Sequence, residues 1–394
     1  MKIDTDEKKI QEILTRGVEN VYPSREEFEK ALRSGKQLTV YNGIDPTGPT
    51  LHIGHGVVLL KLRQLQELGH KIILLIGDFT GMIGDPTDKT ATRKKLTRKE
   101  VLANCKNYAK QAGRILDMKK VDLKYNSKWL GKLRAGDFLE LGSEITVQRL
   151  LERDMFQKRM QDAKPIYLHE FIYPLLQGYD SVAMGVDAEI GGNDQTFNML
   201  VGRDMMKSRG KEKFVLTTKL LVDPTGKKMG KTEGNMVTPE DTPEEMYGKV
   251  MSWPDTLMPV AFEICTRVPT DEMKNILAGD PRDAKMKLAR EIVTLYRSAK
   301  DATAAEENFI QVFQKKEAPT EVQSYKLKVK SLNVLDLLVE TKLATSKGEA
   351  RRLVEQGGVK VGEKIIDDIN AVVEISAEGI LIQKGKRHFV KVKS

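Results

Sequence analysis

Two histidines stand three residues apart in the segment His52-Ile53-Gly54-His55. The segment lies where a loop containing Gly and Pro, residues 43–49, meets apolar residues whose spacing predicts a helix over 54–68. A helix N-terminus presents free N–H groups and the positive end of the helix dipole, which suits a polyphosphate. The alternative is a pair of polar loop histidines without a chemical role. Because the chain has only 5 histidines, the position of this pair favours phosphate binding.

A second candidate is the lysine-rich run Lys228-Met229-Gly230-Lys231-Thr232, which follows a predicted strand over 215–222 and a turn over 223–226. Mobile ammonium groups on a loop that contains glycine can follow negative charge onto a leaving pyrophosphate. Taken alone, the same run is also typical of an ordinary solvated basic turn.

Three polar residues, Tyr173, Gln177 and Asp180, share one face of a helix predicted over 173–184, because they stand at i, i+4 and i+7. A phenol, an amide and a carboxylate on one stripe form a polar surface that a core helix would avoid. An exposed polar stripe is the alternative. Pro174 disfavours a helical conformation at Tyr173, so we expect the helix to begin or kink there.

An open α/β sheet is the fold that would position these residues. The run at 71–77 is almost continuously apolar, as expected for a strand buried on both faces of a parallel sheet. Ligands of such sheets bind beyond the carboxyl ends of the strands. We therefore expect the chemistry in the loops that start at Gly43, Gly77 and Gly191. The predicted order is charged helix up to about residue 33, strand 38–41, helix 54–68, strand 71–77, helix 173–184, strand 188–190, helix after Asn193 and strand 215–222.

The pattern changes after Thr238, where helices separated by Pro-containing turns are predicted up to about residue 314. Residues 315–330 are charged and lack a clear period, which is typical of a linker. The remainder, 332–394, reads as a compact unit of short strands around a short basic helix. Ser346 and Glu349 form the capping-box signature that begins this helix.

Composition favours a multidomain enzyme without disulfides. The chain has 394 residues, with Lys+Arg 65 against Asp+Glu 56, a net charge of +9 that favours an anionic partner. Two cysteines, Cys105 and Cys265, are too few for a disulfide framework or a structural zinc site. The N-terminus lacks the apolar core of a signal peptide, and no apolar run approaches the roughly 20 residues of a membrane span. We expect a soluble cytoplasmic protein without a membrane partner.

Taken together, the two motifs resemble the HIGH and KMSKS-type signatures of the class I aminoacyl-tRNA synthetases. The first is intact at 52–55, and the second carries Gly and Thr in place of two serines. Further segments make most of the chain similar to the bacterial-type tyrosyl-tRNA synthetases: 41–47, 81–86, 173–180 and 191–195. The sequence departs from the family's commoner forms at Asn42, often Cys there, and at Gly48-Pro49.

The resemblance implies a domain order and a fold class. A Rossmann-like parallel-sheet catalytic domain would occupy 1–238, with an inserted dimer segment near 124–164. An α-helical domain on the anticodon side would follow over 239–314. After a linker at 315–331, residues 332–394 would form a small α+β RNA-binding domain similar to a ribosomal small-subunit protein.

The resemblance also implies residue roles. Tyr41 and Asp180 would hold the phenol of a tyrosine substrate. The other tyrosine-binding residues would be Thr80, Asp85, Tyr173, Gln177 and Gln195. The catalytic residues would be His52, His55, Lys228, Lys231 and Thr232. ATP would contact Asp45, Thr47, Gly54, Lys89, Arg93, Gly192, Asp194 and Lys231. tRNA would contact Arg351, Arg352, Lys384, Lys386 and Arg387.

The implied activity is that of a tyrosine--tRNA ligase: ATP-dependent formation of tyrosyl-adenylate, then transfer to the terminal ribose of tRNA(Tyr). Mg²⁺ would accompany the ATP, and we expect no tightly bound cofactor and no resident metal. A homodimer is implied. One alternative is a tryptophanyl-type synthetase or another nucleotidylyltransferase with a HIGH motif, and Tyr41 and Asp180 argue against it. The other is a non-catalytic RNA-binding protein on a decayed scaffold, and the presence of both signatures argues against that.

Overall fold

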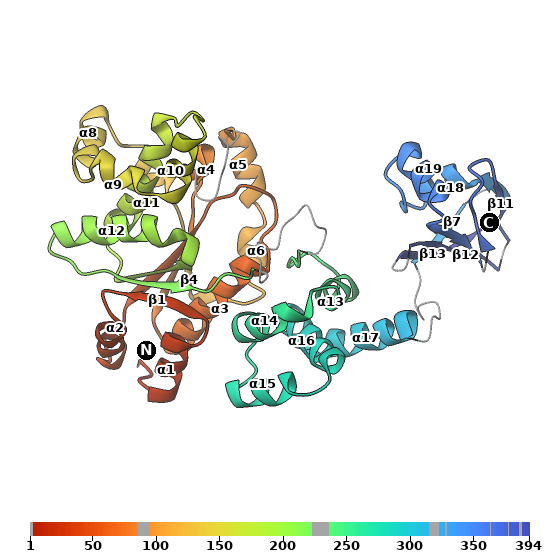
Figure 1. Ribbon diagram of the computed structural model, residues 1–394, viewed down its shortest axis with the longest axis horizontal. Coiled ribbons are helices and arrows are strands. Elements are labelled where there is room, and N and C mark those ends of the chain that lie inside the picture. Colours follow the sequence, from red (N-terminus) through yellow and green to blue (C-terminus); the bar gives the residue numbers. More distant parts are fainter. Residues whose placement is uncertain are drawn as a thin grey trace. The chain divides into compact units, whose positions relative to one another are not determined.

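The chain folds as two compact units, Met1–Ala302 and Thr303–Ser394 (Figure 1). The computed structural model describes residues 3–85, 95–222, 236–314, 323–327, 329–362, 364–376, 378–385 and 388–394.

A six-stranded sheet of order β1-β6-β5-β2-β3-β4 forms the centre of the first unit. Only β1 runs antiparallel to its neighbour, and the other pairs are parallel. The apolar run predicted over 71–77 forms β3, whose residues 72–76 are buried. The predicted open α/β class is therefore confirmed. The strands are β1 (Val18–Tyr22), β2 (Thr39–Ile44), β3 (Lys71–Ile76), β4 (Val121–Tyr125), β5 (Ala188–Gly192) and β6 (Phe214–Thr218).

The strand order reverses between β2 and β5. From β2 the chain crosses through helix α3 (Ile53–Glu67) to β3 on one side, whereas from β5 it crosses through α12 (Thr196–Ser208) to β6 on the other. Because such crossovers are right-handed, the opposite directions place α3 and α12 on opposite faces of the sheet. Ligands of open α/β sheets bind at such a reversal, beyond the carboxyl ends of its strands.

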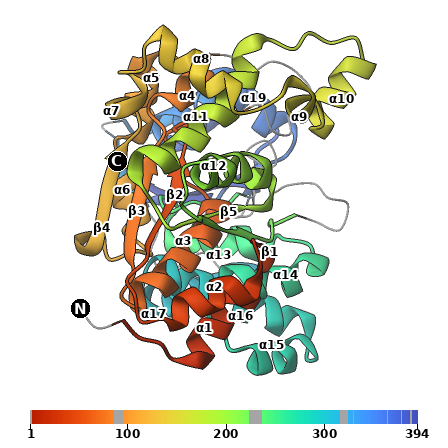
Figure 2. The ribbon, with the colours of Figure 1, turned by 90° about the vertical axis from the view of Figure 1, so that its left-hand side faces the viewer.

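Helix α11 (Leu168–Met184) carries the predicted polar stripe and packs along α12 (Figure 2). It begins before Tyr173, so Pro174 lies inside the helix and neither starts nor ends it. The two helices approach closely at a pair of glycines: a Cβ on Gly178 would lie 3.2 Å from the backbone nitrogen of Gly202.

The helix predicted for the N-terminal residues is interrupted by a strand. Residues up to about 33 were predicted to be helical throughout, but β1 separates α1 (Glu7–Thr15) from α2 (Arg25–Arg33). β1 closes the edge of the sheet beside β6, where Val21 pairs with Leu216. A partner so distant in the chain leaves no local pattern, and this pairing overrides the helical tendency of the charged flanks.

Two groups among the remaining helices of the first unit lie at opposite ends of it. Helices α8 to α10 lie at the end far from α1 and α14 to α16 in both views (Figures 1 and 2). The helical character predicted after Thr238 is confirmed. The helices are α4 (Thr80–Ile83), α5 (Arg98–Cys105), α6 (Tyr108–Ala112), α7 (Ser127–Leu130), α8 (Ala135–Ser143), α9 (Val147–Leu151), α10 (Asp154–Gln161), α13 (Pro243–Met251), α14 (Met258–Cys265), α15 (Thr270–Leu277), α16 (Pro281–Tyr296) and α17 (Ala299–Phe309), the last running into the second unit.

A five-stranded sheet of order β10-β9-β12-β13-β7 and a two-stranded sheet β11-β8 form the second unit with α18 (Val334–Glu340) and α19 (Lys347–Glu355). Ser346 caps α19 by accepting from the Glu349 N–H, which is one half of the predicted capping box, whereas the Glu349 carboxylate accepts from Thr345 and not from the Ser346 N–H. Leu337 and Ile382 lie in its fully buried core. The strands are β7 (Gln323–Lys326), β8 (Ser331–Asn333), β9 (Val359–Val361), β10 (Lys364–Ile365), β11 (Val372–Glu374), β12 (Ile380–Lys384) and β13 (His388–Lys393).

Strand β7 lies within the stretch predicted as a linker. It pairs in parallel with β13, with Tyr325 opposite Val392. The sheet of the second unit therefore begins upstream of residue 332. The charged pattern of this stretch did not indicate a strand, because the partner that orders it is the last strand of the chain.

No helix among the described residues is both long and apolar enough to cross a membrane.

Candidate active site

A pocket of about 550 Å³ opens at the carboxyl ends of β2, β3 and β5, where the strand order reverses. Gly43, Gly77 and Gly191 all line it, so the three loops expected from the strand pattern do meet. Residues from α3 and α11 complete the wall.

Every predicted tyrosine- or ATP-binding residue that the structure describes lines this one pocket. They are Tyr41, Asp45, Thr47, His52, Gly54, His55, Thr80, Asp85, Tyr173, Gln177, Asp180, Gly192, Asp194 and Gln195. Lys89, Arg93, Lys228, Lys231 and Thr232 lie outside the described residues. Leu221 and Met236, which stand near the two ends of the undescribed segment 223–235, line the same pocket.

The two motif histidines lie at the N-terminus of α3. The Nδ1 atom of His55 accepts a hydrogen bond of 3.1 Å from the backbone N–H of His52. In the neutral imidazole the proton of His55 is therefore on Nε2, which makes that atom a donor. The backbone N–H of Ile53 donates over 2.9 Å to the carbonyl of Val237, so the start of α3 is joined to the chain that follows the undescribed lysine segment.

Asp45, directly after β2, accepts two hydrogen bonds at the pocket. Thr80 donates over 2.6 Å and the Tyr173 hydroxyl over 2.9 Å. Gly77 makes room for this carboxylate, because a Cβ there would lie only 2.0 Å from Asp45 Oδ1. Burial, and then the charge of Asp45, raise the pKa of Tyr173 well above its usual value, so this phenol remains a donor.

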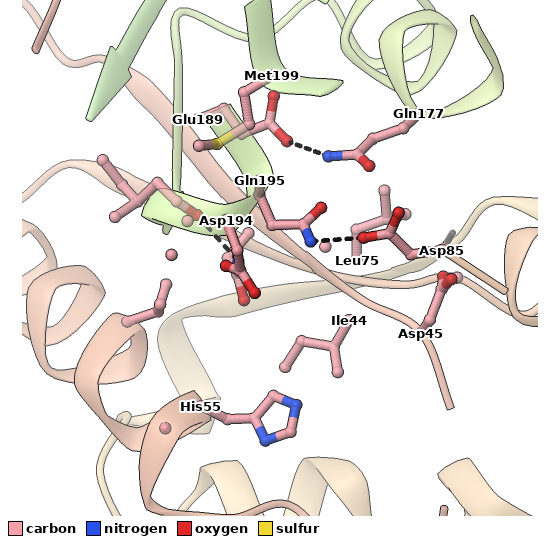
Figure 3. Close-up of a pocket in the computed structure, with 18 of the residues that line it drawn as sticks. Ile44, Asp45, His55, Leu75, Asp85, Gln177, Glu189, Asp194, Gln195 and Met199 are labelled. Atoms are coloured by element: carbon pink, nitrogen blue, oxygen red, sulfur yellow. Dashed lines mark hydrogen bonds between the residues drawn. The ribbon is translucent and has the colours of Figure 1, made fainter. Parts of the chain in front are cut away.

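Asp85 and Gln177 provide a second group of hydrogen-bond acceptors at the pocket (Figure 3). Asp85 accepts from the Gln195 amide over 2.6 Å, and an Arg153 nitrogen lies 3.9 Å from its other oxygen. The Gln177 amide donates to Glu189 over 3.3 Å, and within the described part of the chain its buried Oε1 has no hydrogen-bond partner. Carboxylates and an open amide oxygen fit a protonated amine.

Asp180 forms the polar floor of the pocket and is 3% exposed. Its carboxylate accepts from the Trp129 indole over 2.7 Å and from the Asn126 amide over 3.2 Å. Burial raises the pKa of Asp180 well above its usual value, and these two donors oppose that rise. The two oxygens of a carboxylate can accept more than these two hydrogen bonds, so the site suits a ligand that brings an O–H.

The Tyr41 ring packs among apolar side chains beside this floor, including Ile73, Leu75 and Val186. Its hydroxyl lies 2.8 Å from Ser181 Oγ. Burial raises the pKa of Tyr41 well above its usual value, so the hydroxyl keeps its proton. An apolar wall with hydroxyl and carboxylate groups at its end fits a flat ring that carries a hydroxyl.

Several polar residues of this site were not predicted from the sequence. Asn126 directly follows β4, so the rule that placed the other loops would have found it had that strand been predicted. Ser181 is the neighbour of a predicted residue. Trp129, Glu189 and Lys213 have no signal in the local sequence.

The predicted tRNA-binding residues have different surroundings in the second unit. Arg351 and Arg352 are exposed on α19. Lys384 instead lies 2.8 Å from the Glu349 carboxylate and donates over 2.6 Å to the Leu343 carbonyl. The bond from Lys384 is the main reason that the pKa of Glu349 falls to about 2. The Lys384 ammonium therefore joins β12 to the start of α19, and its contact with tRNA phosphate stays a prediction. Lys386 and Arg387 lie outside the described residues.

The comparisons with known proteins first define the class. Residues 33–314 match the family of tRNA synthetases class I (W and Y), and the chain belongs to this family. Residues 314–392 match the tyrosine--tRNA ligase SYY-like C-terminal domain.

The relatives then define the member of the class. A tyrosine--tRNA ligase from Moorella thermoacetica is 46% identical over 391 residues, covering 96% of this chain and 94% of that protein. The one from Thermotoga maritima is 44% identical and covers 96% of each chain. A C-terminally truncated mitochondrial tyrosyl-tRNA synthetase from Coccidioides posadasii superposes with a TM-score of 0.62 at 26% identity, covering 76% of this chain and 91% of that one. Within the class, the chain groups with the tyrosine--tRNA ligases.

Proposed function

We propose that this pocket forms tyrosyl-adenylate. The carboxylate of L-tyrosine attacks the α-phosphorus of ATP, a new P–O bond forms, and pyrophosphate leaves. In the second step the terminal ribose of tRNA(Tyr) takes the tyrosyl group and AMP leaves. The observation that carries this proposal is the buried floor of Asp180 in the same pocket as the two histidines at the N-terminus of α3.

The two polar regions of the pocket suit the two ends of tyrosine. Asp180 accepts the phenol O–H, and Tyr41 contacts the phenol oxygen. The ammonium group is held by Asp85, Tyr173 and Gln177, whose acceptors face the pocket beside Asp45. Phenylalanine would leave the buried groups of the floor unpaired, at a cost of about 1–3 kcal/mol for each group.

The ATP end of the pocket contains the histidine motif. His52 and His55 donate to the phosphates at the N-terminus of α3, and Gly54 lets the base approach the backbone. Thr47, Gly192 and Asp194 contact the nucleotide, the last two at the ribose. The resemblance assigns the transferring phosphates to Lys228, Lys231 and Thr232, together with Lys89 and Arg93. Positioning and electrostatic stabilisation supply the rate, and no covalent intermediate with the protein is needed.

Mg²⁺ enters as part of the ATP substrate, held mainly by phosphate oxygens.

The other domains serve the tRNA. Residues 239–314 face the anticodon side. The exposed pair Arg351 and Arg352 on α19 contacts phosphates. The ligase works in the cytoplasm, where its tRNA substrate is charged.

A homodimer forms through the segment near 124–164. This segment and its C-terminal flank expose large apolar side chains, with Leu139 78% and Leu168 75% exposed, alongside Val147, Met160 and Tyr167. The wild type should sediment at twice the mass of one chain. The Leu139→Asp, Leu168→Asp double variant should sediment as a monomer in analytical ultracentrifugation, because each change places a charge in an apolar interface.

Leu102→Asp provides the matched control, since Leu102 is an exposed leucine on α5, outside the segment. It should leave the dimer intact. A wild-type monomer, or a double variant that still dimerises, contradicts the assignment.

Tyrosine-dependent exchange of radioactive pyrophosphate into ATP tests the function directly. The purified protein should exchange pyrophosphate only when an amino acid is added, and L-tyrosine should support the exchange far better than L-tryptophan. A preference for tryptophan would identify the other branch of the family. ATP binding without any exchange would favour a non-catalytic RNA-binding protein.

A further inference from the structure

A fully buried lysine lies behind the tyrosine pocket. Lys213, directly before β6, is 0% exposed. Its ammonium forms an ion pair with Glu189 and lies 2.8 Å from Ser181 Oγ and 3.1 Å from the Met199 carbonyl oxygen. Removing a charge from water is unfavourable unless partners compensate. The three contacts provide that compensation, and one of them, with Ser181, connects Lys213 to Tyr41 at the pocket.

The hydrogen bonds of Lys213 have a defined direction. An ammonium group has three donors and no acceptor, and here it has three oxygen partners. Ser181 Oγ must therefore accept from Lys213. After this bond, the Ser181 hydroxyl keeps one hydrogen and one lone pair.

The contact of 2.8 Å between Ser181 and Tyr41 can run in either direction. A cation that donates to Ser181 polarises its hydroxyl, which becomes a stronger donor and a weaker acceptor. The favoured order is therefore Lys213 to Ser181 to Tyr41. In that order the Tyr41 oxygen accepts from Ser181, and the Tyr41 proton is left for an acceptor, which is either the neighbouring Glu189 carboxylate or a ligand oxygen in the pocket.

We propose that Lys213 is a positioning residue for recognition of the substrate hydroxyl. Acting through Ser181, it makes the Tyr41 hydroxyl a donor to the phenol oxygen of tyrosine. This inference rests on the proposed function, in which Asp180 accepts the phenol O–H. The substrate phenol uses its proton to donate to Asp180, so its oxygen can only accept from a further group. The Tyr41 hydroxyl can donate to that oxygen only when it accepts from Ser181, which is the order that Lys213 favours.

The surrounding fold keeps Lys213 in place. Gly202 on α12 leaves room for the ammonium, because a Cβ at that position would lie 2.7 Å from Lys213 Nζ and 2.9 Å from Ser181 Oγ. The ammonium also lies 5.7 Å from the centre of the Tyr41 ring, within range of a cation–π contact.

A simpler role for Lys213 would be to neutralise Glu189, which orients the Gln177 amide. That role would act through Gln177 at the amino-acid backbone end of the substrate, which tyrosine and phenylalanine share, and through the charge of Glu189 on Tyr41, which Glu189→Gln removes. The proposed role affects only the hydroxyl, which phenylalanine lacks. The two roles therefore predict different changes in selectivity.

The test measures kcat/KM for tyrosine and for phenylalanine by pyrophosphate exchange in the full-length protein. Lys213→Met and Ser181→Ala should each lower the tyrosine-to-phenylalanine ratio by about tenfold, because each breaks the same chain of hydrogen bonds. The double variant should lose little more than either single variant. KM for ATP should stay within about twofold. Ser208→Ala is the matched control, since Ser208 lies on α12 and its side chain, among the described residues, bonds to the nearby Met205 carbonyl and Arg209 and not to the pocket.

Two outcomes would overturn the inference. Equal losses for tyrosine and phenylalanine in Ser181→Ala would show that the chain does not act on the hydroxyl. Recovery of selectivity in the Lys213→Met, Glu189→Gln double variant would show that Lys213 only neutralises a charge. Ser181→Ala retains the Lys213–Glu189 ion pair, so it decides the question even where Lys213→Met fails to fold. Absence of any tyrosine preference in the wild type would instead contradict the proposed function.

Discussion

The Asp180→Ala variant should lower kcat/KM for tyrosine by about 10³-fold, while KM for ATP stays within about twofold. The change removes the acceptor of the substrate O–H and leaves the donors of Trp129 and Asn126 unpaired in a buried site. Each such loss costs about 1–3 kcal/mol, and about 4 kcal/mol corresponds to the expected factor. The proposed ATP site is the end of the pocket formed by α3 and the loop after β5, which this change does not reach.

Pyrophosphate exchange with each substrate varied in turn provides the measurement. Asp180→Asn is the matched variant, because it keeps the shape and one acceptor oxygen but loses the charge. It should fall between the wild type and Asp180→Ala. Similar losses for tyrosine and ATP would remove the phenol assignment, since they would point to general damage to the fold.

Removal of residues 315–394 should leave tyrosine-dependent pyrophosphate exchange within about twofold of the wild type and lower tRNA charging by at least about 10²-fold. The pocket lies wholly within the first unit, whose core does not include the second. The cut precedes β7, because β7 pairs with β13 and would otherwise be left without its sheet. Lost phosphate contacts weaken RNA binding steeply, which explains the large effect on charging alone.

Aminoacylation of tRNA(Tyr) and exchange would be measured on the same preparations. The Arg351→Ala, Arg352→Ala double variant in the full chain provides a finer comparison. It should lower charging by roughly tenfold and reduce the salt dependence of tRNA binding, since two phosphate contacts are removed. Unchanged charging after the deletion would mean that the second unit serves another purpose.

The strands whose partners are close in the sequence were predicted well. The apolar run of β3 and the helix α3 before it have local patterns that survive in the structure. β1 and β7 were missed because each is ordered by a strand far away in the chain. β4 was missed as well, and with it Asn126, a donor to the floor of the pocket.

The residues of the site also divide into those that local sequence patterns predict and those that only contacts between distant elements reveal. The sequence by itself determined the α/β alternation, the two signatures and the polar stripe of Tyr173, Gln177 and Asp180, because periodicity and motif spacing depend on neighbours along the chain. Only the tertiary structure decided that Lys213 meets Ser181 behind Tyr41 and that Trp129 donates to Asp180. These contacts join separate elements, and the low dielectric of a buried site makes their direction and pairing matter. No local pattern records which buried polar groups will face each other.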